Sequence, residues 1–386
     1  MLYALLLLLA LSPAAAVATE CPGSSLYPKE AFVDANCDEC YHALDGDRLG
    51  VQSSLLGAFV GQPDECLVVP DGVLLRPPKS VTLDWFIDGA VWLRGDVKIP
   101  GGEFFSGYLD VEATGDLHVD GKIVVGRNGG IDLRTSPTSV GASIYIGDGA
   151  KLISYVSPTF YAEGVLSGND PSIVIGDRVK IKGKRFSHRA WADANLVVGD
   201  FVKVIAVDNQ FGGDLDWRAN NGAVTIGRKF KVKATGKFFS AQPVPEGKIL
   251  IHAIGGDLSM GPDASLVTVD PLRLRAEGSV LVEEGARLTV RGDHLNLAVL
   301  DIRAGDQVSI EGARFKCRRG EYTAGSLLRL SAVLAASFPS LTSFHTFATT
   351  EPGGTCDVTG TVFPQGAIIS YGCDNVVGSP GGAFLD

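Results

Sequence analysis

The most informative absence in this sequence of 386 residues is that of cysteine from its long middle section, because no cysteine lies between Cys66 and Cys317. The seven cysteines form two end clusters, which are Cys21, Cys37, Cys40 and Cys66, and then Cys317, Cys356 and Cys373. Clusters of this kind are typical of disulfides that close terminal caps in an oxidising compartment. We expect the disulfides to use Cys21, Cys37, Cys40, Cys66, Cys356 and Cys373. Because seven is an odd number, at least one thiol is left free.

Several kinds of catalytic and metal-binding motif are also missing. The sequence has no GxSxG, HExxH, phosphate-binding loop or zinc-finger spacing, and its six histidines are scattered. Cys37 and Cys40 form a single CxxC with no second CxxC or histidine pair to complete a metal site. The formal net charge of −10 disfavours a general nucleic-acid binder. We therefore expect no metal, no cofactor and no nucleic-acid partner.

No apolar run is long enough to cross a bilayer, which needs about 20 residues. The short run Leu5–Leu11 is followed by small residues that end in Ala16-Val17-Ala18, which is typical of a cleaved signal peptide. The last residues, GSPGGAFLD, carry no hydrophobic tail for a lipid anchor. We expect residues 1–18 to be a signal peptide and the mature protein to be secreted, either extracellular or at the cell surface, without a transmembrane anchor.

What the sequence does contain is a repeated phrase. SIYIGDGAKLISY from Ser143 returns as SIVIGDRVKIKG from Ser172, NLVVGDFVKVIA from Asn195 and AVTIGRKFKVKA from Ala223. Each phrase alternates apolar and polar residues around a turn, which is the pattern of a strand with one buried face. The phrases align on the apolar anchors Val125, Ile146, Ile175, Val198, Ile226, Met260, Val282 and Ile302, and each anchor is followed six residues later by Ile, Leu or Val. Short strands that recur every 20 to 50 residues predict a solenoid.

The repeat allows two solenoids. The Ile-Gly-Asp phrase is similar to the hexapeptide unit of left-handed β-helices, but the hexad does not continue around the coil. The uneven anchor spacing favours a right-handed parallel β-helix with loops at its corners, and in this coil pattern residues 68–317 resemble the pectate-lyase-like superfamily. We therefore predict an all-β, right-handed parallel β-helix solenoid with N-terminal and C-terminal disulfide-bearing caps.

The caps are assigned to the parts of the chain where the pattern stops. Residues 19–67 form a Cys-rich cap with a possible helix from Arg48 to Phe59, and residues 318–386 form the second cap. The apolar stretch from Ala324 to Leu341, between Gly325 and Pro339, predicts a helix in this second cap. Cys356 and Cys373 would close a hairpin behind it.

Stacking of the repeat predicts columns of surface side chains. The position five residues after each anchor brings Lys151, Lys180, Lys203 and Lys231 together, about 4.8 Å apart. A neighbouring column of acids would compensate these charges through the pairs Asp148–Lys151, Asp177–Lys180, Asp200–Lys203 and Glu284–Arg287. Two bands, 178–189 and 228–237, contain no acid and favour attraction of a polyanion.

In a secreted protein, that polyanion is expected to be an acidic or sulfated polysaccharide. Aromatic residues of the inserted loops can stack on sugar rings, while arginine and lysine bind carboxylates or sulfates. The candidate ligand-binding residues are Lys180, Lys182, Lys184, Arg185, Arg189, Trp191, Trp217, Arg228, Lys231 and Lys233. The two tryptophans have the alternative role of filling the core.

We expect a non-catalytic extracellular or matrix protein, and two other readings stay open. The first is a carbohydrate-active enzyme on the same fold, a polysaccharide lyase or a glycoside hydrolase, since the resemblance is to a superfamily that contains such enzymes. Its candidate catalytic residues are Asp214, Asp216, His188 and Arg218. The second is a purely structural or adhesin-like surface protein.

Overall fold

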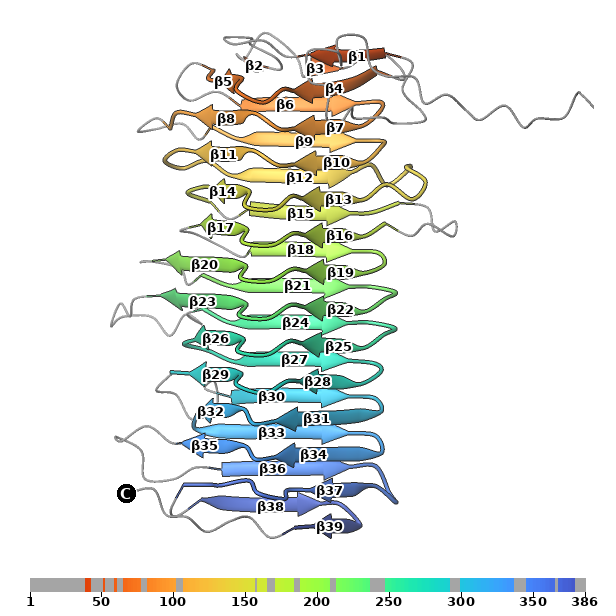
Figure 1. The fold of residues 1–386 in the computed structure, drawn as a ribbon, viewed down its shortest axis with the longest axis vertical. Coiled ribbons are helices and arrows are strands. Elements are labelled where there is room, and N and C mark those ends of the chain that lie inside the picture. Colours follow the sequence, from red (N-terminus) through yellow and green to blue (C-terminus); the bar gives the residue numbers. More distant parts are fainter. Residues whose placement is uncertain are drawn as a thin grey trace, which may run out of the picture.

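The computed structural model describes residues 39–42, 51–52, 59–60, 65–77, 82–101, 107–156, 158–164, 171–183, 188–208, 213–236, 247–291, 299–336, 345–364 and 367–378. These residues form an elongated β-solenoid in which successive coils stack along one axis (Figure 1). The described ranges contain strands and turns but no helix. The prediction of a parallel β-helix is confirmed.

Most coils of the solenoid contribute one strand to each of three sheets, which we number in the order in which the chain visits them. The first sheet contains β1 (Glu39–His42), β4 (Glu65–Val69), β7 (Val91–Leu93), β10 (Leu117–Val119), β13 (Ile144–Ile146), β16 (Ile173–Ile175), β19 (Leu196–Val198), β22 (Val224–Ile226), β25 (Leu258–Met260), β28 (Val280–Val282), β31 (Gln307–Glu311), β34 (Leu327–Ser331), β37 (Thr355–Asp357) and β39 (Asn375–Val377). The second sheet contains β5 (Leu74–Leu75), β8 (Asp96–Ile99), β11 (Lys122–Val125), β14 (Lys151–Ile153), β17 (Lys180–Gly183), β20 (Lys203–Asp208), β23 (Lys231–Gly236), β26 (Ser265–Thr268), β29 (Arg287–Val290), β32 (Arg314–Lys316) and β35 (Leu334–Ala336).

The third sheet closes each coil. It contains β2 (Val51–Gln52), β3 (Phe59–Val60), β6 (Thr82–Ile87), β9 (Leu109–Ala113), β12 (Ile131–Thr135), β15 (Pro158–Ala162), β18 (His188–Ala192), β21 (Leu215–Ala219), β24 (Ile249–Ala253), β27 (Leu272–Ala276), β30 (Val299–Ala304), β33 (Arg319–Ala324), β36 (His345–Thr350) and β38 (Ile368–Gly372). Neighbouring strands in all three sheets are parallel, except that β2 pairs antiparallel with β6 at the N-terminal end. Strands of one sheet therefore come from successive coils, and equivalent residues lie in columns.

The core is built from the apolar residues of the repeated phrase. Ile146 pairs with Ile175, Ile175 with Val198, and the column continues through Ile226 and Met260 to Val282. All of these side chains are buried. The predicted register of these six anchors is confirmed.

The predicted register is wrong for the first and the last anchor, Val125 and Ile302, each of which lies in a different sheet from the other six. Val125 lies in the second sheet, paired with Ile99, and the residue that continues the column is Val119. Ile302 lies in the third sheet, and Ile310 occupies the expected place. The turns between sheets differ in length from coil to coil, so a fixed spacing follows the wrong strand where a turn is shorter or longer.

Two predicted helices are corrected. The described residues within 48–59 are β-strand, in β2 and at the start of β3. In the stretch from Ala324 to Leu341, the described residues end at Ala336 and contain β34 and β35, and the solenoid continues past Cys317 to β39. Leu328 and Leu330 pair with Val308 and Ile310 of the preceding coil, so stacking onto an existing sheet outweighs the helical propensity of this Leu- and Ala-rich segment.

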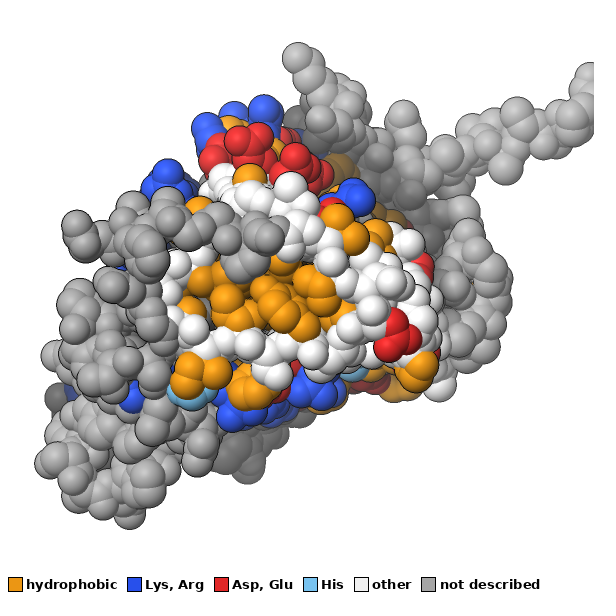
Figure 2. Space-filling model, turned by 90° about the horizontal axis from the view of Figure 1, so that it is seen from below, with side chains coloured by type: hydrophobic (Ala, Val, Ile, Leu, Met, Phe, Trp, Pro, Cys, Tyr) orange, Lys and Arg blue, Asp and Glu red, His pale blue; other side chains and the backbone are white. Residues whose placement is uncertain are grey.

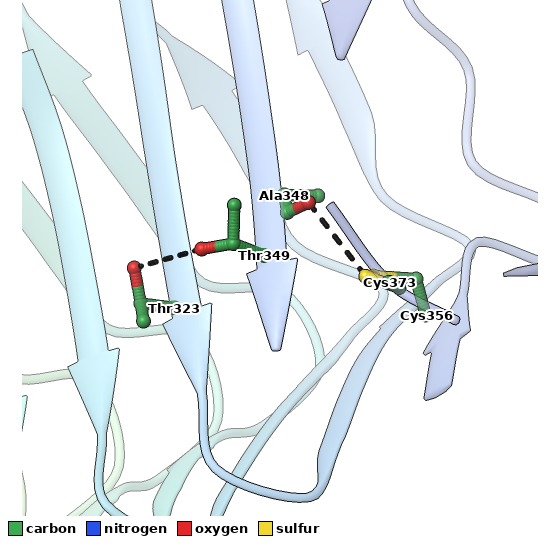
Figure 3. Close-up of a disulfide and its surroundings, with 5 residues drawn as sticks. All are labelled: Thr323, Ala348, Thr349, Cys356 and Cys373. Carbon is green, nitrogen blue, oxygen red and sulfur yellow. Dashed lines mark hydrogen bonds between the residues drawn. A yellow bond between two sulfur atoms is a disulfide. The ribbon is translucent and has the colours of Figure 1, made fainter. Parts of the chain in front are cut away.

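The C-terminal end of the solenoid carries a disulfide between Cys356 of β37 and Cys373, which follows β38 (Figure 3). The hairpin expected here is wrong, because β37 pairs parallel with β34 and β39. The Cys373 sulfur also lies 3.6 Å from the backbone oxygen of Ala348, in β36. Hydrophobic side chains gather at the centre of this end of the molecule (Figure 2).

Three further cysteines lie within the described ranges, and one of them, Cys40 of β1, pairs in register with Cys66 of β4. Cys66 is disulfide-bonded, in agreement with its place in the N-terminal cluster. Cys317 is free and buried, and burial raises the pKa of its thiol to about 12. Cys21 and Cys37 lie outside the described residues.

Candidate functional site

In five successive coils, the strand that belongs to the second sheet begins with a lysine. Lys122 pairs with Lys151, Lys151 with Lys180, Lys180 with Lys203, and Lys203 with Lys231. We call these five residues the lysine ladder. Their Cα atoms follow the strand spacing of a sheet, about 4.8 Å per coil. Each lysine follows a turn and precedes a buried residue of the strand, so its side chain points away from the core.

The lysine ladder contains the four predicted lysines and adds Lys122. The sequence alignment missed Lys122 because it followed the wrong strand in that coil and placed Gly130 in this column. Beyond Lys231 the column continues with Ser265, Arg287 and Arg314. The cationic column therefore extends over eight coils, with one interruption.

The acids beside the lysine ladder do not neutralise it in the expected way. The Asp148 carboxylate accepts a hydrogen bond from the backbone N–H of Asp177, and Asp177 accepts one from the N–H of Asp200, each at 2.7 Å. The backbone N–H of Lys122 donates to the Asp96 carboxylate at 3.1 Å. No side chain of a ladder lysine forms an ion pair or a hydrogen bond with another described residue, and the predicted pairs Asp148–Lys151, Asp177–Lys180 and Asp200–Lys203 are absent. The carboxylates instead bind the exposed backbone of the next turn.

Asp200, the last acid of this column, forms an ion pair in addition to its hydrogen bond with the backbone. Its carboxylate accepts the backbone N–H of Arg228 at 2.8 Å and forms an ion pair with the Arg228 guanidinium at 2.5 Å. These bonds lower the pKa of Asp200, with the backbone hydrogen bond as the largest cause. Arg228, a predicted ligand residue, therefore lies at the corner between the first and second sheets and is already paired in part.

The same corner holds a row of residues with left-handed backbone. Arg178, Phe201 and Lys229 have φ values of 58°, 60° and 55°. This conformation costs roughly 1 kcal/mol or more for a residue other than glycine. It turns the three side chains outward, and the Lys229 ammonium lies 5.2 Å from the centre of the Phe201 ring, which is 43% exposed. The corner thus adds cations and an exposed aromatic ring to the edge of the lysine ladder.

Lys182 and Lys233 lie on the second sheet two residues beyond the ladder. Ile205 separates them in their column, since it pairs with Lys182 on one side and Lys233 on the other. These two predicted ligand residues therefore share a face with the lysine ladder. Lys184 and Arg185 lie outside the described residues.

The remaining predicted ligand residues belong to the third sheet, not to the lysine face. Arg189 and Trp191 of β18 face outward, with the Arg189 guanidinium 5.6 Å from the centre of the Trp191 ring. Trp217 is 1% exposed and packs in the core, 5.5 Å from the Phe230 ring. The expectation that Trp217 contacts a ligand is wrong, because alternation along β21 directs this side chain inward.

The four candidate catalytic residues do not form a common site. His188 is buried, its Nε2 lies 3.2 Å from the backbone oxygen of Ile205, and burial lowers its pKa to about 4. Asp216 is bound by Arg218 at 2.7 and 2.9 Å and faces outward, while His188 points into the core. Asp214 accepts the backbone N–H of Lys248 at 2.9 Å, and burial raises its pKa.

A different group of acids on the third sheet escaped the sequence reasoning. Asp84 pairs with Asp110, and Asp110 with Asp132, in β6, β9 and β12. Arg134 donates to both oxygens of Asp110, at 2.9 and 3.0 Å, and to Asp132 at 3.1 Å. The signal was present in the sequence, because Leu83-Asp84, Leu109-Asp110 and Ile131-Asp132 repeat one dipeptide. The alignment on the apolar anchors follows the phrase of the first sheet and does not cover these third-sheet strands.

Asp132 and Asp110 line a cavity of about 310 Å³ on the surface of the third sheet. Its other lining residues are Thr82, Tyr108, Gly130, Ile131, Val156 and Thr159. Burial raises the pKa of Asp132 to about 6, and the neighbouring Asp110 and Glu112 add to this effect while Arg134 opposes it. A carboxyl with a raised pKa that lies beside a second carboxyl is an arrangement used in general acid–base catalysis.

Comparisons of the chain with protein-family models, curated proteins and solved structures found no match. Among the described residues, no three His, Cys, Asp or Glu side chains are grouped so that they can bind a metal ion. No helix in the described ranges is long and apolar enough to span a membrane.

Proposed function

We propose that this protein is an extracellular, non-catalytic binding protein that holds acidic polysaccharide along the lysine ladder. The observation that carries the proposal is the register of Lys122, Lys151, Lys180, Lys203 and Lys231 on five adjacent coils. Their side chains form no ion pair with an acid among the described residues. Secretion is supported by the N-terminal signal-like sequence and by the Cys356–Cys373 disulfide.

The charge on this face favours a polyanion. Between Asp148 and Lys233, the described outward side chains of the corner and the second sheet include nine cations and three acids, a net charge of +6. The cations are Lys151, Arg178, Lys180, Lys182, Lys203, Arg228, Lys229, Lys231 and Lys233. Two unit charges one coil apart repel by roughly 1 kcal/mol even in water, so a linear anion along the column relieves an existing repulsion.

The rigid spacing also explains why a chain, and not a small ion, is the expected ligand. A single sulfate or carboxylate contacts one or two rungs, and an exposed contact of that kind contributes up to about 1 kcal/mol. A polymer engages many rungs while it loses translational freedom only once, so its affinity exceeds that of its monomer by orders of magnitude. The exposed ring of Phe201 provides an apolar surface for a sugar ring at the edge of the ladder.

Incubation of the mature protein with acidic, sulfated and neutral polysaccharides tests this proposal. We expect retention of the acidic and sulfated chains, release at high salt, and no newly formed chain ends. Retention of neutral chains to the same extent would contradict a charge-based site. Absence of retention on every chain would leave a structural or adhesin-like coat role as the better account.

A second candidate function is a carbohydrate-active enzyme, and the cavity around Asp132 is the observation that favours it. A carboxyl with a pKa of about 6 is partly protonated near neutral pH and can donate a proton, while Asp110, bound by Arg134, provides a second carboxylate. If this function is correct, new chain ends appear in the same incubation and Asp132→Asn abolishes them. Asp214→Asn is the matched control and should leave the product unchanged.

A further inference from the structure

The outward face of the third sheet carries a second concentration of positive charge, made of arginine in place of lysine. Six arginines face outward between β18 and β33, and we call them the arginine patch: Arg189, Arg218, Arg273, Arg275, Arg303 and Arg319. The acids on the same strands and face are Asp216, Asp301 and Glu321. Six charges against three leave the patch with a net charge of +3.

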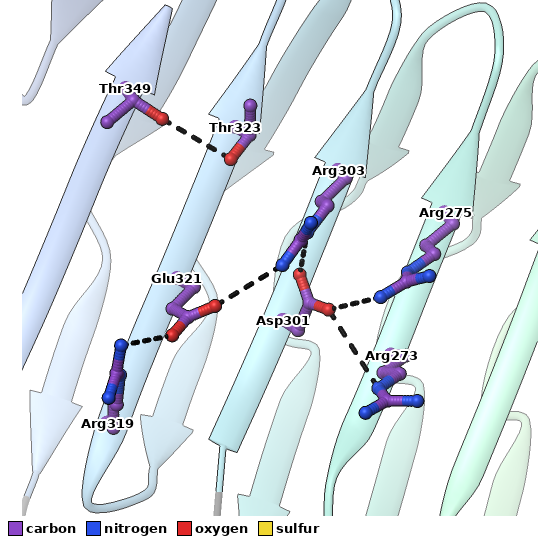
Figure 4. A network of polar contacts seen from close by, with 8 residues as sticks. All are labelled: Arg273, Arg275, Asp301, Arg303, Arg319, Glu321, Thr323 and Thr349. Carbon is purple, nitrogen blue, oxygen red and sulfur yellow. Dashed lines mark hydrogen bonds and ion pairs between the residues drawn. The ribbon is translucent and has the colours of Figure 1, made fainter. Parts of the chain in front are cut away.

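One buried carboxylate organises the centre of the arginine patch. Asp301 is 5% exposed and lies 2.6 Å from Arg303, 2.8 Å from Arg275 and 3.9 Å from Arg273 (Figure 4). A single carboxylate neutralises only one of these three guanidinium groups. The three arginine side chains are 33 to 48% exposed, so each retains N–H donors that face solvent.

Glu321 extends the same arrangement by one coil. It lies 2.6 Å from Arg319 and 3.4 Å from Arg303, so Arg303 connects the two acids (Figure 4). Arg275 and Arg303 are direct neighbours in the register of β27 and β30. The acids thus fix the guanidinium groups in position, and fixed forks are suited to bind carboxylate or sulfate through two parallel hydrogen bonds.

Aromatic rings lie at both ends of the arginine patch. The Trp191 ring has Arg189 at 5.6 Å and Arg218 at 4.9 Å from its centre. At the other end, Arg319 lies 4.9 Å from the centre of the Phe347 ring, which is 37% exposed. Trp191 is partly buried and Phe347 is exposed. Surface rings of this kind next to arginine forks fit a ligand that has both apolar ring faces and anionic substituents, and an acidic sugar has both.

We propose that the arginine patch is a second binding surface for an acidic oligosaccharide, so that the solenoid bridges two polysaccharide chains. The choice of an acidic glycan as the ligand rests on the proposed function, whereas the site itself rests on separate residues of a different sheet. The lysine ladder is on the second sheet and the arginine patch is on the third, which face different directions around the same coils. A short chain therefore occupies one face or the other.

Isothermal titration with a sulfated tetrasaccharide tests the proposal, since four sugar residues are too few to cover both faces. We expect two molecules to bind per chain of the wild-type protein. Substitution of Lys151, Lys180, Lys203 and Lys231 by Gln removes one site, and substitution of Arg189, Arg273, Arg303 and Arg319 by Gln removes the other. The two variants change the net charge equally, so each is the control for the other.

A third variant guards against loss of folding in the arginine network. Replacement of Arg273, Arg275 and Arg303 by Lys keeps every charge but removes the forks, and we expect at least tenfold weaker binding at the patch with the ladder site unchanged. Wild-type protein should also join polysaccharide-coated beads to soluble labelled chain, while either glutamine variant binds beads without joining them.

Specific outcomes overturn the inference. If the arginine variants keep two sites and full bridging, the patch does not bind glycan, and the proposed function of the ladder is unaffected. If the lysine variant keeps two sites and the arginine variant loses one, the proposed function of the ladder is wrong and binding at the arginine patch is supported. If the arginine variants turn a dimer into a monomer without a change in glycan binding, the patch pairs with a second copy and the inference is wrong.

Discussion

At the scale of single residues, the buried His188 should make the free energy of unfolding depend on pH. Its ring lies in the core, where burial holds its pKa at about 4, well below the value of about 6.5 in an unfolded chain. Between these two values the unfolded state binds a proton that the folded state does not. The free energy of unfolding should therefore decrease as the pH falls from about 6.5 to about 4, by roughly 3 kcal/mol from this residue.

The substitution His188→Leu isolates this contribution. Leucine is the residue at the equivalent position of the next coil, Leu215, so the core is suited to it. We expect the variant to lose less stability than the wild type over this pH range in denaturant titrations. Equal pH dependence of the two proteins would show that His188 does not stay neutral in the folded state.

The aspartates beside the lysine ladder offer a second test with single residues. Asp177→Asn keeps an oxygen that accepts the N–H of Asp200 but removes a negative charge near Lys180. We expect unchanged stability and polyanion affinity roughly two to five times higher, the effect of one exposed charge. Asp177→Ala loses the hydrogen bond as well and should cost about 1 kcal/mol of stability. Weaker polyanion binding by the asparagine variant would contradict the proposed site.

At the scale of elements, the disulfide at the C-terminal end should act only on the coils that it joins. Cys356 and Cys373 are 17 residues apart, and a cross-link of that length stabilises by about 3 kcal/mol in the chain-entropy model. Replacement of both cysteines by alanine should reduce the hydrogen-exchange protection of β37, β38 and β39. Protection of β16 and β19 in the same sample serves as the control, because each coil contacts mainly its neighbours. Loss of protection throughout the solenoid would contradict this local role.

The same scale shows what the sequence can and cannot predict. The column from Ile146 to Val282 was predictable because identical phrases impose the same register on neighbouring coils. The segment after Ala324 is predicted as a helix, since its leucines and alanines favour a helix in isolation, whereas in the fold they pair with strands β31 and β32 of the preceding coil. The acids at Asp84, Asp110 and Asp132 required an alignment of the third-sheet phrase, which is less regular than the first.

Side-chain direction and pairing were the least predictable parts of the candidate site. Trp217 and Arg218 are adjacent, yet one fills the core and the other faces solvent, and the frame of the alternation fixes this choice. Asp177 and Lys180 have the spacing of an ion pair, but the turn between them directs the carboxylate to the backbone of the next coil. The lysine ladder was predictable in outline because its regularity comes from the repeat itself.

At the scale of the whole molecule, the protein is a stack of coils whose two outer faces carry different cations. The lysine ladder presents separate flexible charges at a regular spacing, while the arginine patch presents forks fixed by the buried Asp301 and the partly exposed Glu321. Both lie on an overall acidic chain with a net charge of −10, so the positive charge is concentrated where the coils place it. The fold thus converts a local repeat into an extended surface that matches a linear polymer.

The most direct test of the central claim is the salt dependence of polyanion binding as the rungs are neutralised one by one. Lys151, Lys180, Lys203 and Lys231 are replaced cumulatively by Gln, and the binding constant for a sulfated polysaccharide is measured at several salt concentrations. By the counterion-release argument for linear polyanions, each substitution should reduce the slope of log K against log salt by up to about 0.7. Lys248→Gln and Arg329→Gln, which remove exposed charges from other faces, should leave the slope nearly unchanged. A slope that does not respond to the ladder substitutions, or that responds equally to the two controls, would contradict the claim that the ladder holds the chain.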